Sequence, residues 1–304
     1  MDIFNLNSYT SKTLEKQIFE MSETYKFLQV STIGVSNLGA PIRCIRFGKG
    51  PKEILYVGST HANEFITSPL LMIFLEVLCN SYVNGLTVYG KNPKRLYNKV
   101  SLYIVPMLNP DGVDLVQDAI PKNSEEYKTA VQISKNYPSI PFPSGWKANI
   151  LGVDLNLQFP AGWDEAKRIK YSQGFSSPAP RDFVGFSPLS TPEAKAIYNF
   201  ILRHNFKLML TYHTQGETIY WQYQNYAPTN SLTIANKFAE SSGYSVSDVP
   251  FDSGFAGLKD WYLQSYRRPG FTIEAGKGTN PLPLSDLSNM FENNFGILVL
   301  GMDV

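Results

Sequence analysis

Short apolar, strand-like stretches alternate with helical stretches along most of the 304-residue chain. Helical stretches are expected near residues 9–27, 66–83, 190–204, 230–242 and 284–300, and strands near residues 27–36, 41–48, 53–60, 100–108, 206–214 and 270–276. Thr191, Pro192 and Glu193 form a good start signal for the third helix. Strands interleaved with helices predict an α/β fold, with a mostly parallel sheet covered by helices on both faces.

The composition of the chain limits the number of domains and the kinds of partner that the protein can bind. No repeat, charged block or flexible linker divides the sequence, so we expect one domain over 1–304, with residues 1–30 as a leading helical segment packed on it. Lys and Arg number 27 against 26 Asp and Glu, which gives no electrostatic basis for binding nucleic acid or an anionic membrane. Because no 18 consecutive residues are apolar, we expect no transmembrane segment and no membrane insertion.

The N-terminus and the cysteines favour a cytoplasmic protein. The first residues lack a basic segment followed by an apolar one, so they do not resemble a signal peptide. Cys44 and Cys79 are too few for a disulfide framework and fit a reducing compartment, although a single bridge between them is the alternative.

Three strand ends carry side chains suited to chemistry. In a parallel sheet, ligands bind at the carboxyl ends of the strands. His61 and Glu64 follow the strand near 53–60, His213 lies at the end of the strand 206–214, and Glu274 ends the strand "GFTIE". A strand-end histidine often only forms a hydrogen bond, but three such positions at one edge of a sheet favour a functional site.

His61, Glu64 and His213 are the expected metal ligands. Hydrolytic zinc takes three protein ligands, commonly His and Glu, and leaves a fourth position for water. The chain has only one further histidine, His204, which ends a helix, where histidines commonly interact with the last carbonyl groups. We therefore choose His213 as the third ligand.

Glu274 is the expected general base. A single charge at the end of a buried strand costs free energy unless it is used or paired. The alternative is a strand-end carboxylate in a structural salt bridge.

These residues resemble the zinc carboxypeptidase family in order and spacing. The matching motifs are "HANE" at 61–64, "NPDG" at 109–112, "GVDLN" at 152–156, "TYHT" at 211–214 and "FTIE" at 271–274, within roughly residues 30–300. The resemblance implies one α/β domain with a mixed eight-stranded sheet. It also implies one zinc ion on His61, Glu64 and His213, with Glu274 as general base and acid.

One departure from the family affects the substrate. The resemblance assigns substrate binding to Asn156 and to the next position, where the family has an arginine that holds the substrate's terminal carboxylate. This chain has Leu157 there. Without the bidentate guanidinium, an ordinary digestive carboxypeptidase activity is not expected.

Two longer strings resemble one branch of the family. "GVDLNLQFPAGW" at 152–163 and "EAGKGTNPLPL" at 274–284 are similar to the bacterial γ-D-glutamyl-L-diamino acid endopeptidases. These enzymes cut the γ-D-glutamyl–meso-diaminopimelate bond of cell-wall peptides. Several secreted members carry wall-binding LysM repeats, which this sequence lacks, so we expect a cytoplasmic member that acts on muropeptide fragments during recycling or sporulation.

Two further positions follow from the resemblance. Lys147 stands where the family has an arginine that stabilises the oxyanion, and Lys259 stands at the floor of the pocket for the side chain after the scissile bond. Lys259 is expected to bind the distal carboxylate of diaminopimelate, or alternatively to point into solvent. The tyrosine of many carboxypeptidases has no match in Pro250, Phe251 or Asp252.

The expected reaction is metal-assisted amide hydrolysis, in which zinc polarises the carbonyl and Glu274 carries the proton from water to the leaving amine. A carboxypeptidase with another way of binding the terminal carboxylate is one alternative. A catalytically inactive wall-fragment binder is the other, but the chain retains every expected ligand and the base.

Overall fold

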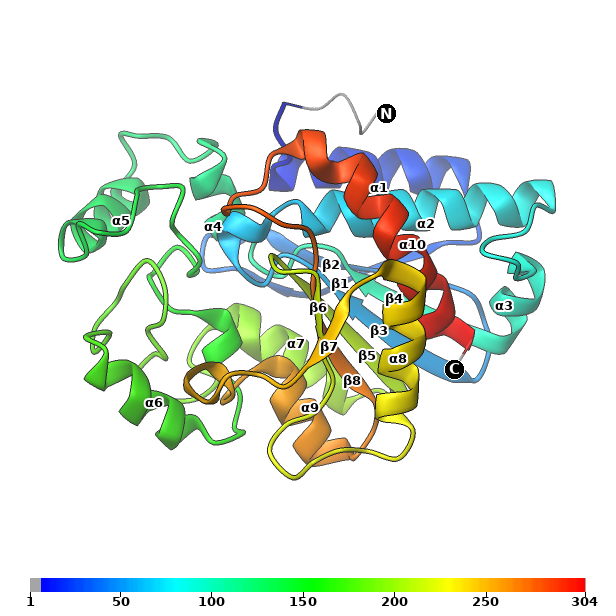
Figure 1. Cartoon of the computed structure of the whole chain (residues 1–304). Coiled ribbons are helices and arrows are strands. Elements are labelled where there is room, and N and C mark those ends of the chain that lie inside the picture. The colour runs from blue at the N-terminus through cyan, green and yellow to red at the C-terminus, as the bar shows by residue number, and fades with distance from the viewer. Residues whose placement is uncertain (1–6, 304) are drawn as a thin grey trace.

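The computed structural model describes residues 7–303 and places one eight-stranded sheet at the centre of the protein (Figure 1). The strands run in the order β1-β2-β4-β3-β5-β8-β6-β7. Their bounds are β1 Gln29–Val35, β2 Pro41–Phe47, β3 Lys52–Val57, β4 Val100–Val105, β5 Leu208–His213, β6 Thr218–Tyr220, β7 Ser245–Ser247 and β8 Gly270–Glu274. The extreme ends of the expected domain and of its leading segment, residues 1–6 and 304, lie outside the described residues.

The centre of the sheet is parallel and its flanks are mixed. Strands β4, β3, β5 and β8 pair in parallel, whereas β1, β2 and β4 pair antiparallel, as do β8 and β6. Strands β6 and β7 pair in parallel at the far edge. The expected mixed eight-stranded α/β fold is therefore confirmed, and its parallel centre directs four strand ends to one edge.

Helices cover both faces because the central strands are apolar on both faces. In β3, Ile54 and Tyr56 belong to one core cluster, and Leu55 and Val57 belong to the other. The first cluster packs under α1 Ser11–Thr24, α2 Thr67–Asn84, α3 Pro93–Lys99, α8 Ser231–Ser242 and α10 Leu287–Asp303. The second packs under α6 Trp163–Ser172, α7 Pro192–Leu202 and α9 Leu258–Tyr266, on the opposite face in Figure 1.

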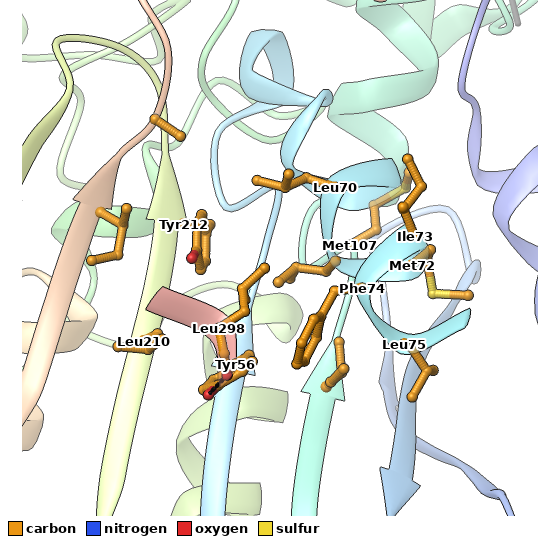
Figure 2. Packing of buried hydrophobic residues seen from close by; sticks show 14 of the residues in the cluster. Tyr56, Leu70, Met72, Ile73, Phe74, Leu75, Met107, Leu210, Tyr212 and Leu298 are labelled. Atoms are coloured by element: carbon orange, nitrogen blue, oxygen red, sulfur yellow. Dashed lines mark hydrogen bonds between the residues drawn. The ribbon is translucent and has the colours of Figure 1, made fainter. Parts of the chain in front are cut away.

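The larger core lies between the sheet, α2 and α10. Figure 2 shows Tyr56 of β3 beside Leu298 of α10, and the Tyr56 hydroxyl donates to the Leu298 carbonyl oxygen at 2.7 Å. Gly301 lets the helix approach this closely, because a Cβ there would lie 2.4 Å from the Tyr56 hydroxyl oxygen.

The most apolar helical segment is a core element. By length and composition alone, residues Ala62–Asn84 could cross a membrane. However, 72% of the most apolar window is buried inside the protein. Core burial therefore accounts for the apolar character of this segment.

The cysteines and several elements differ from the sequence expectations. Cys44 and Cys79 are free, buried, and in different core clusters, so the alternative of a bridge between them is wrong. The expected helix at 284–300 is a 3-10 turn, Leu284–Asp286, followed by α10. Helices α3, α4 Pro110–Val116, α5 Glu125–Lys135, α6 and α9 were not predicted.

The long connection between β4 and β5 lies along the sheet edge at which the parallel strands end. Asn109 caps α4, where its side-chain oxygen accepts from Gly112 N–H at 3.2 Å. Its amide nitrogen donates to the carbonyl oxygens of Thr60 at 3.3 Å and Ala148 at 3.0 Å. The "NPDG" motif thus joins the loop before His61 to the loop that carries Lys147.

Candidate metal centre and active site

The strand ends bring together the residues that the sequence singled out. His61 lies just before the short 3-10 helix Ala62–Glu64, which follows β3. His213 is the last residue of β5 and is paired in register with Glu274, the last residue of β8. Because β3, β5 and β8 are neighbours, all four side chains lie at one edge of the sheet.

Three of these side chains converge on one point. The Nδ1 atoms of His61 and His213 are 3.1 Å apart. The Glu64 carboxylate lies 3.0 Å from His61 Nδ1 through Oε1 and 2.9 Å from His213 Nδ1 through Oε2. All three residues are buried, and their potential ligand atoms lie within 4.8 Å of one another.

This arrangement fits a zinc ion. Tetrahedral zinc binds histidine nitrogen at about 2.0–2.1 Å, which places neighbouring ligand atoms ~3.3 Å apart. The observed separations of 2.9 to 3.1 Å are close to that spacing. Two imidazole nitrogens and a carboxylate also form a donor set that zinc favours in hydrolases.

Asp154 orients the first ligand. Its Oδ1 lies 3.1 Å from His61 Nε2, and its Oδ2 accepts from the Asp182 backbone N–H at 3.2 Å. A carboxylate on the outer nitrogen keeps the proton there and leaves Nδ1 free for a metal. Asp154 lies within the "GVDLN" motif, but sequence reasoning gave it no role.

Electrostatics at the ligands favour a bound cation. Burial lowers the pKa of His61, but Glu64 and Asp154 outweigh it and raise the pKa to about 9. Burial also opposes ionisation of Glu64, yet His61 and Lys147 hold its pKa well below the usual range. The pKa of His213 is lowered, chiefly by burial. A metal would replace the His61 proton and satisfy the same carboxylate.

Lys147 lies beside the metal ligands, as its expected role requires. Its Nζ atom is 2.8 Å from Glu64 Oε1, and its side chain is largely buried. Its backbone carbonyl oxygen also accepts from the Ala62 N–H at 3.0 Å. The assignment to the oxyanion remains a prediction.

Glu274 lines the same cavity, and its pKa is higher than that of an ordinary glutamate. Burial, followed by the nearby Glu64 charge, raises its pKa to about 8. A carboxylate whose pKa lies near neutrality can both accept and return a proton, which suits a general base.

A single cavity of about 630 Å³ contains these groups. Asn156 and Leu157 also line it, on the 3-10 turn Leu155–Leu157. Asn156 Oδ1 accepts from the Leu258 backbone N–H at 3.1 Å, which fixes the start of α9 against this wall. The Leu157 side chain is buried among apolar residues of the second cluster.

Lys259 points into the protein. Its side chain is 4% exposed and lines the cavity, so the alternative of a solvent-facing lysine is wrong. Its Nζ lies 2.6 Å from Asp260 Oδ1 and donates to the Gln222 carbonyl oxygen at 2.8 Å. The protein itself thus supplies an anionic partner, so an anionic substrate group is not needed to stabilise this lysine.

His204 lies elsewhere. Its Nδ1 atom is 2.9 Å from Glu53 Oε1. Glu53 is near the start of β3, so His204 lies at the opposite edge of the sheet from the carboxyl ends of the strands. It pairs with this carboxylate instead of with the carbonyl groups of the preceding helix. Where many family members have a tyrosine, the 3-10 turn Phe251–Ser253 stands.

Arg181 and Lys170 line the cavity but were not predicted. Arg181 lies in the Pro- and Ser-rich loop between α6 and α7, which has no periodicity to mark it. Only the folded connection between β4 and β5 brings it to the site.

The sequence is similar to that of known zinc peptidases. A family model described as zinc carboxypeptidase matches residues 14–295. The gamma-D-glutamyl-L-diamino acid endopeptidase 1 of Lysinibacillus sphaericus is 42% identical over 295 residues, which cover 97% of this chain and 72% of that protein.

Solved structures share the fold at low identity. The carboxypeptidase A of Helicoverpa armigera aligns with a TM-score of 0.73 at 19% identity, over 99% of this chain and 74% of that one. The murein-tripeptide amidase MpaA of Escherichia coli O157 aligns with a TM-score of 0.54 at 19% identity, over 89% and 91%.

Proposed function

The chain belongs to the zinc carboxypeptidase family, and from that premise we propose that it hydrolyses the γ-D-glutamyl–meso-diaminopimelate amide bond of bacterial cell-wall peptides. The observation that carries the proposal is the 42% identity, over 97% of this chain, to a γ-D-glutamyl-L-diamino acid endopeptidase. The chain is a zinc metallopeptidase, and its substrate in this proposal is a muropeptide.

The residues of the chain divide the reaction between them. Zinc, held by His61, Glu64 and His213, would polarise the scissile carbonyl and activate a water molecule. Glu274 accepts a proton from that water and returns it to the nitrogen of the leaving amine. The Lys147 ammonium offers positive charge to the carbonyl oxygen as negative charge develops there.

The leaving group, diaminopimelate, has charged groups at the far end of its side chain. The distal end of diaminopimelate holds an ammonium and a carboxylate, and Lys259 with Asp260 forms a pair of the complementary signs. We assign this pair to the distal end of the leaving group, because both side chains line the cavity.

The tetrapeptide L-Ala-γ-D-Glu-meso-diaminopimelate-D-Ala tests the proposal by mass spectrometry. The proposed endopeptidase releases L-Ala-D-Glu and diaminopimelyl-D-Ala. A carboxypeptidase releases free D-Ala instead and leaves a tripeptide, which would contradict the proposal. The tripeptide without D-Ala alone would not separate them, because both activities release diaminopimelate from it.

We also propose that the protein acts in the cytoplasm, on wall fragments that are being recycled. Its two buried free thiols, Cys44 and Cys79, are compatible with a reducing compartment. Fractionation of the native host tests this, and activity found only outside the cytoplasmic membrane would contradict it.

A further inference from the structure

Arg181 lies on the cavity wall beside the metal centre, and no step of the proposed reaction uses it. The backbone on each side of it is anchored. The Pro180 carbonyl oxygen accepts from the N–H groups of Lys147 at 2.7 Å and Ala148 at 2.9 Å. The Asp182 N–H donates to Asp154 at 3.2 Å. The segment around Arg181 is thus anchored to Lys147, which contacts Glu64, and to Asp154, which contacts His61.

The backbone at this point is unusual. Asp182 has a φ of 64°, in the left-handed region that costs a non-glycine residue about 1–2 kcal/mol. Its carboxylate also forms an ion pair with Lys170, with 2.8 Å between Lys170 Nζ and Asp182 Oδ1. The conformation beside Arg181 is therefore fixed by several bonds.

The Arg181 guanidinium retains most of its hydrogen-bonding capacity. Within residues 7–303, its only hydrogen-bond or ion-pair partner is Asp182, whose Oδ2 accepts from Nε at 2.6 Å. The side chain is 44% exposed and lines the cavity. A guanidinium has five N–H donors, so its two terminal nitrogens can hold a carboxylate in a bidentate pair.

The strand order places Arg181 and Lys259 at opposite ends of the site. Along the sheet edge, β3, β5, β8 and β6 follow one another. Asp154 ties the Arg181 segment to His61, which follows β3. Lys259 donates to Gln222, which follows β6. The zinc ligands and Glu274 lie between the two cations.

The order of the strands along the sheet edge indicates which side of the scissile bond Arg181 and Lys259 each face. Glu274, at the end of β8, returns the proton to the leaving amine, so the leaving group extends toward β6 and Lys259. The acyl group must then extend the other way, toward His61 and Arg181.

A γ-linked glutamyl group carries a free carboxylate on that side. Its α-carboxylate is four carbon–carbon bonds from the scissile carbonyl carbon, or about 5 Å in an extended chain. In an ordinary α-linked peptide this carboxyl group is consumed by the scissile amide bond itself. A cation at that distance therefore selects an acyl residue with a free second carboxylate over one without it.

We propose that Arg181 is a specificity-determining residue that binds the α-carboxylate of the γ-glutamyl group on the acyl side of the scissile bond. The inference rests on the proposed function, because the γ-D-glutamyl group of that substrate supplies the free α-carboxylate. An α-amidated substrate, in which D-glutamate is replaced by D-isoglutamine, lacks the charge but keeps the size.

The test compares these two tripeptides, L-Ala-γ-D-Glu-meso-diaminopimelate and its D-isoglutamine counterpart. We expect wild-type kcat/KM to favour the acid by ~10- to 100-fold, since a charge-assisted pair in a half-open site is worth less than a fully buried one. In Arg181→Gln the ratio of acid to amide should fall toward one. In Arg181→Lys, which keeps the charge without the fork, it should be intermediate.

Controls separate recognition from folding. Arg168→Gln, on the exposed face of α6 and paired with Glu165, should keep the wild-type ratio. Zinc content and Tm should be unchanged in Arg181→Gln. Binding of both tripeptides to a Glu274→Gln protein, with and without Arg181→Gln, should show the same change in the ratio of Kd values.

A wild-type ratio near one, or equal losses on both substrates in Arg181→Gln, would overturn the role of Arg181 while the proposed function stands. If the wild-type protein removes D-Ala from the tetrapeptide and releases no diaminopimelyl-D-Ala, the proposed function fails, and the inference falls with it whatever happens to the tripeptides.

Discussion

At the scale of single residues, position on a strand decides which histidine can bind metal. His61 and His213 are at the carboxyl ends of neighbouring parallel strands, and their Nδ1 atoms are 3.1 Å apart. His204 precedes β5 and pairs with Glu53 near the start of β3. The same imidazole group thus serves a metal site at one end of the sheet and a structural ion pair at the other.

This difference predicts opposite results for two alanine substitutions. His213→Ala should remove zinc and activity together, by more than the ~10–100-fold that loss of an outer partner costs a metal site. His204→Ala should keep both. Zinc content by mass spectrometry and turnover of the tripeptide measure the two effects, and the reverse pattern would refute the choice of third ligand.

Glu274→Gln should separate binding from chemistry. The variant keeps the shape of the site but cannot accept a proton, so kcat should fall by ~10²- to 10⁴-fold or more, while zinc and substrate still bind. Isothermal titration and single-turnover kinetics measure the two parts. Near-normal kcat would mean that another group is the base.

The raised pKa of Glu274 also predicts how stability depends on pH in the zinc-free protein. The folded state holds this proton up to a pKa of about 8, whereas the unfolded chain releases it near the ordinary value of 4.5. Between these pH values the unfolded state binds fewer protons, so this group makes stability fall as pH rises. The destabilisation is fully developed above pH 8 and is absent below pH 4.5.

Glu274→Gln should therefore stabilise the zinc-free protein at pH 8 by about 1–3 kcal/mol and have little effect at pH 5. Added zinc should reduce the difference, because a cation favours the ionised carboxylate. Thermal unfolding after chelation at both pH values measures this. A variant no more stable than wild type at pH 8 would contradict the pKa shift.

The strand pattern predicted the site residues that strand ends position, the family resemblance added Lys147 and Asn156 in the β4–β5 connection, and neither signal marked Arg181. His61, His213 and Glu274 each follow or end an apolar strand, so the rule for parallel sheets locates them. Arg181 reaches the cavity only through the bonds of Pro180 and Asp182 to other loops. Such long-range contacts leave no pattern in the local sequence.

At the scale of elements, α9 positions the Lys259–Asp260 pair, which we assign to the leaving group. Asp260 accepts from the Gly257 N–H at 3.1 Å at the start of this helix, and it also contacts Lys259. The start of α9 therefore depends on a residue that also lines the cavity. Substitutions of Asp260 would mix folding with recognition, whereas Lys259 can be changed more cleanly.

Lys259→Met should change the selectivity for the diamino acid. The variant removes the partner of the distal carboxylate and leaves Asp260 free to accept the ammonium of a lysine side chain. The preference for diaminopimelate over lysine should fall by about 2 kcal/mol, measured as the ratio of kcat/KM values. The exposed Lys128→Met is the matched control. Equal losses on both substrates would show that Lys259 does not bind the carboxylate.

The same scale shows why some elements escaped prediction. Strands β6 and β7 have three residues each, too few to display alternation, and they form only through pairing with β8 and each other. Helix α5 fully buries only Ala130 among its residues, and Tyr127 and Ile133 pack partly buried against the core, so its apolar pattern is short. Central strands and α2 were predicted because dense burial requires continuous apolar sequence.

At the scale of the whole molecule, the cavity is assembled from both halves of the chain. The connection between β4 and β5 supplies Lys147, Asn156 and Arg181, and the C-terminal part supplies Lys259 and Glu274. The resulting wall has cations at both ends of the metal centre. A substrate with carboxylates on both sides of its scissile bond complements this arrangement, whereas an ordinary peptide with one terminal carboxylate does not.

This complementarity predicts weak exopeptidase activity. Leu157 stands where the family's carboxylate-binding arginine would be, and it packs into the second core cluster. Acyl-dipeptides ending in free Phe or Lys lack the carboxylates that we assign to Arg181 and Lys259. Because a lost charge-assisted pair costs roughly 2–5 kcal/mol, these dipeptides should be cleaved at least ~10²-fold less efficiently than the γ-D-glutamyl tripeptide. Comparing kcat/KM for these substrates measures the difference. Efficient release of C-terminal Phe or Lys would show that another cation, such as Lys259, holds the terminal carboxylate, and would return the protein to the ordinary carboxypeptidases.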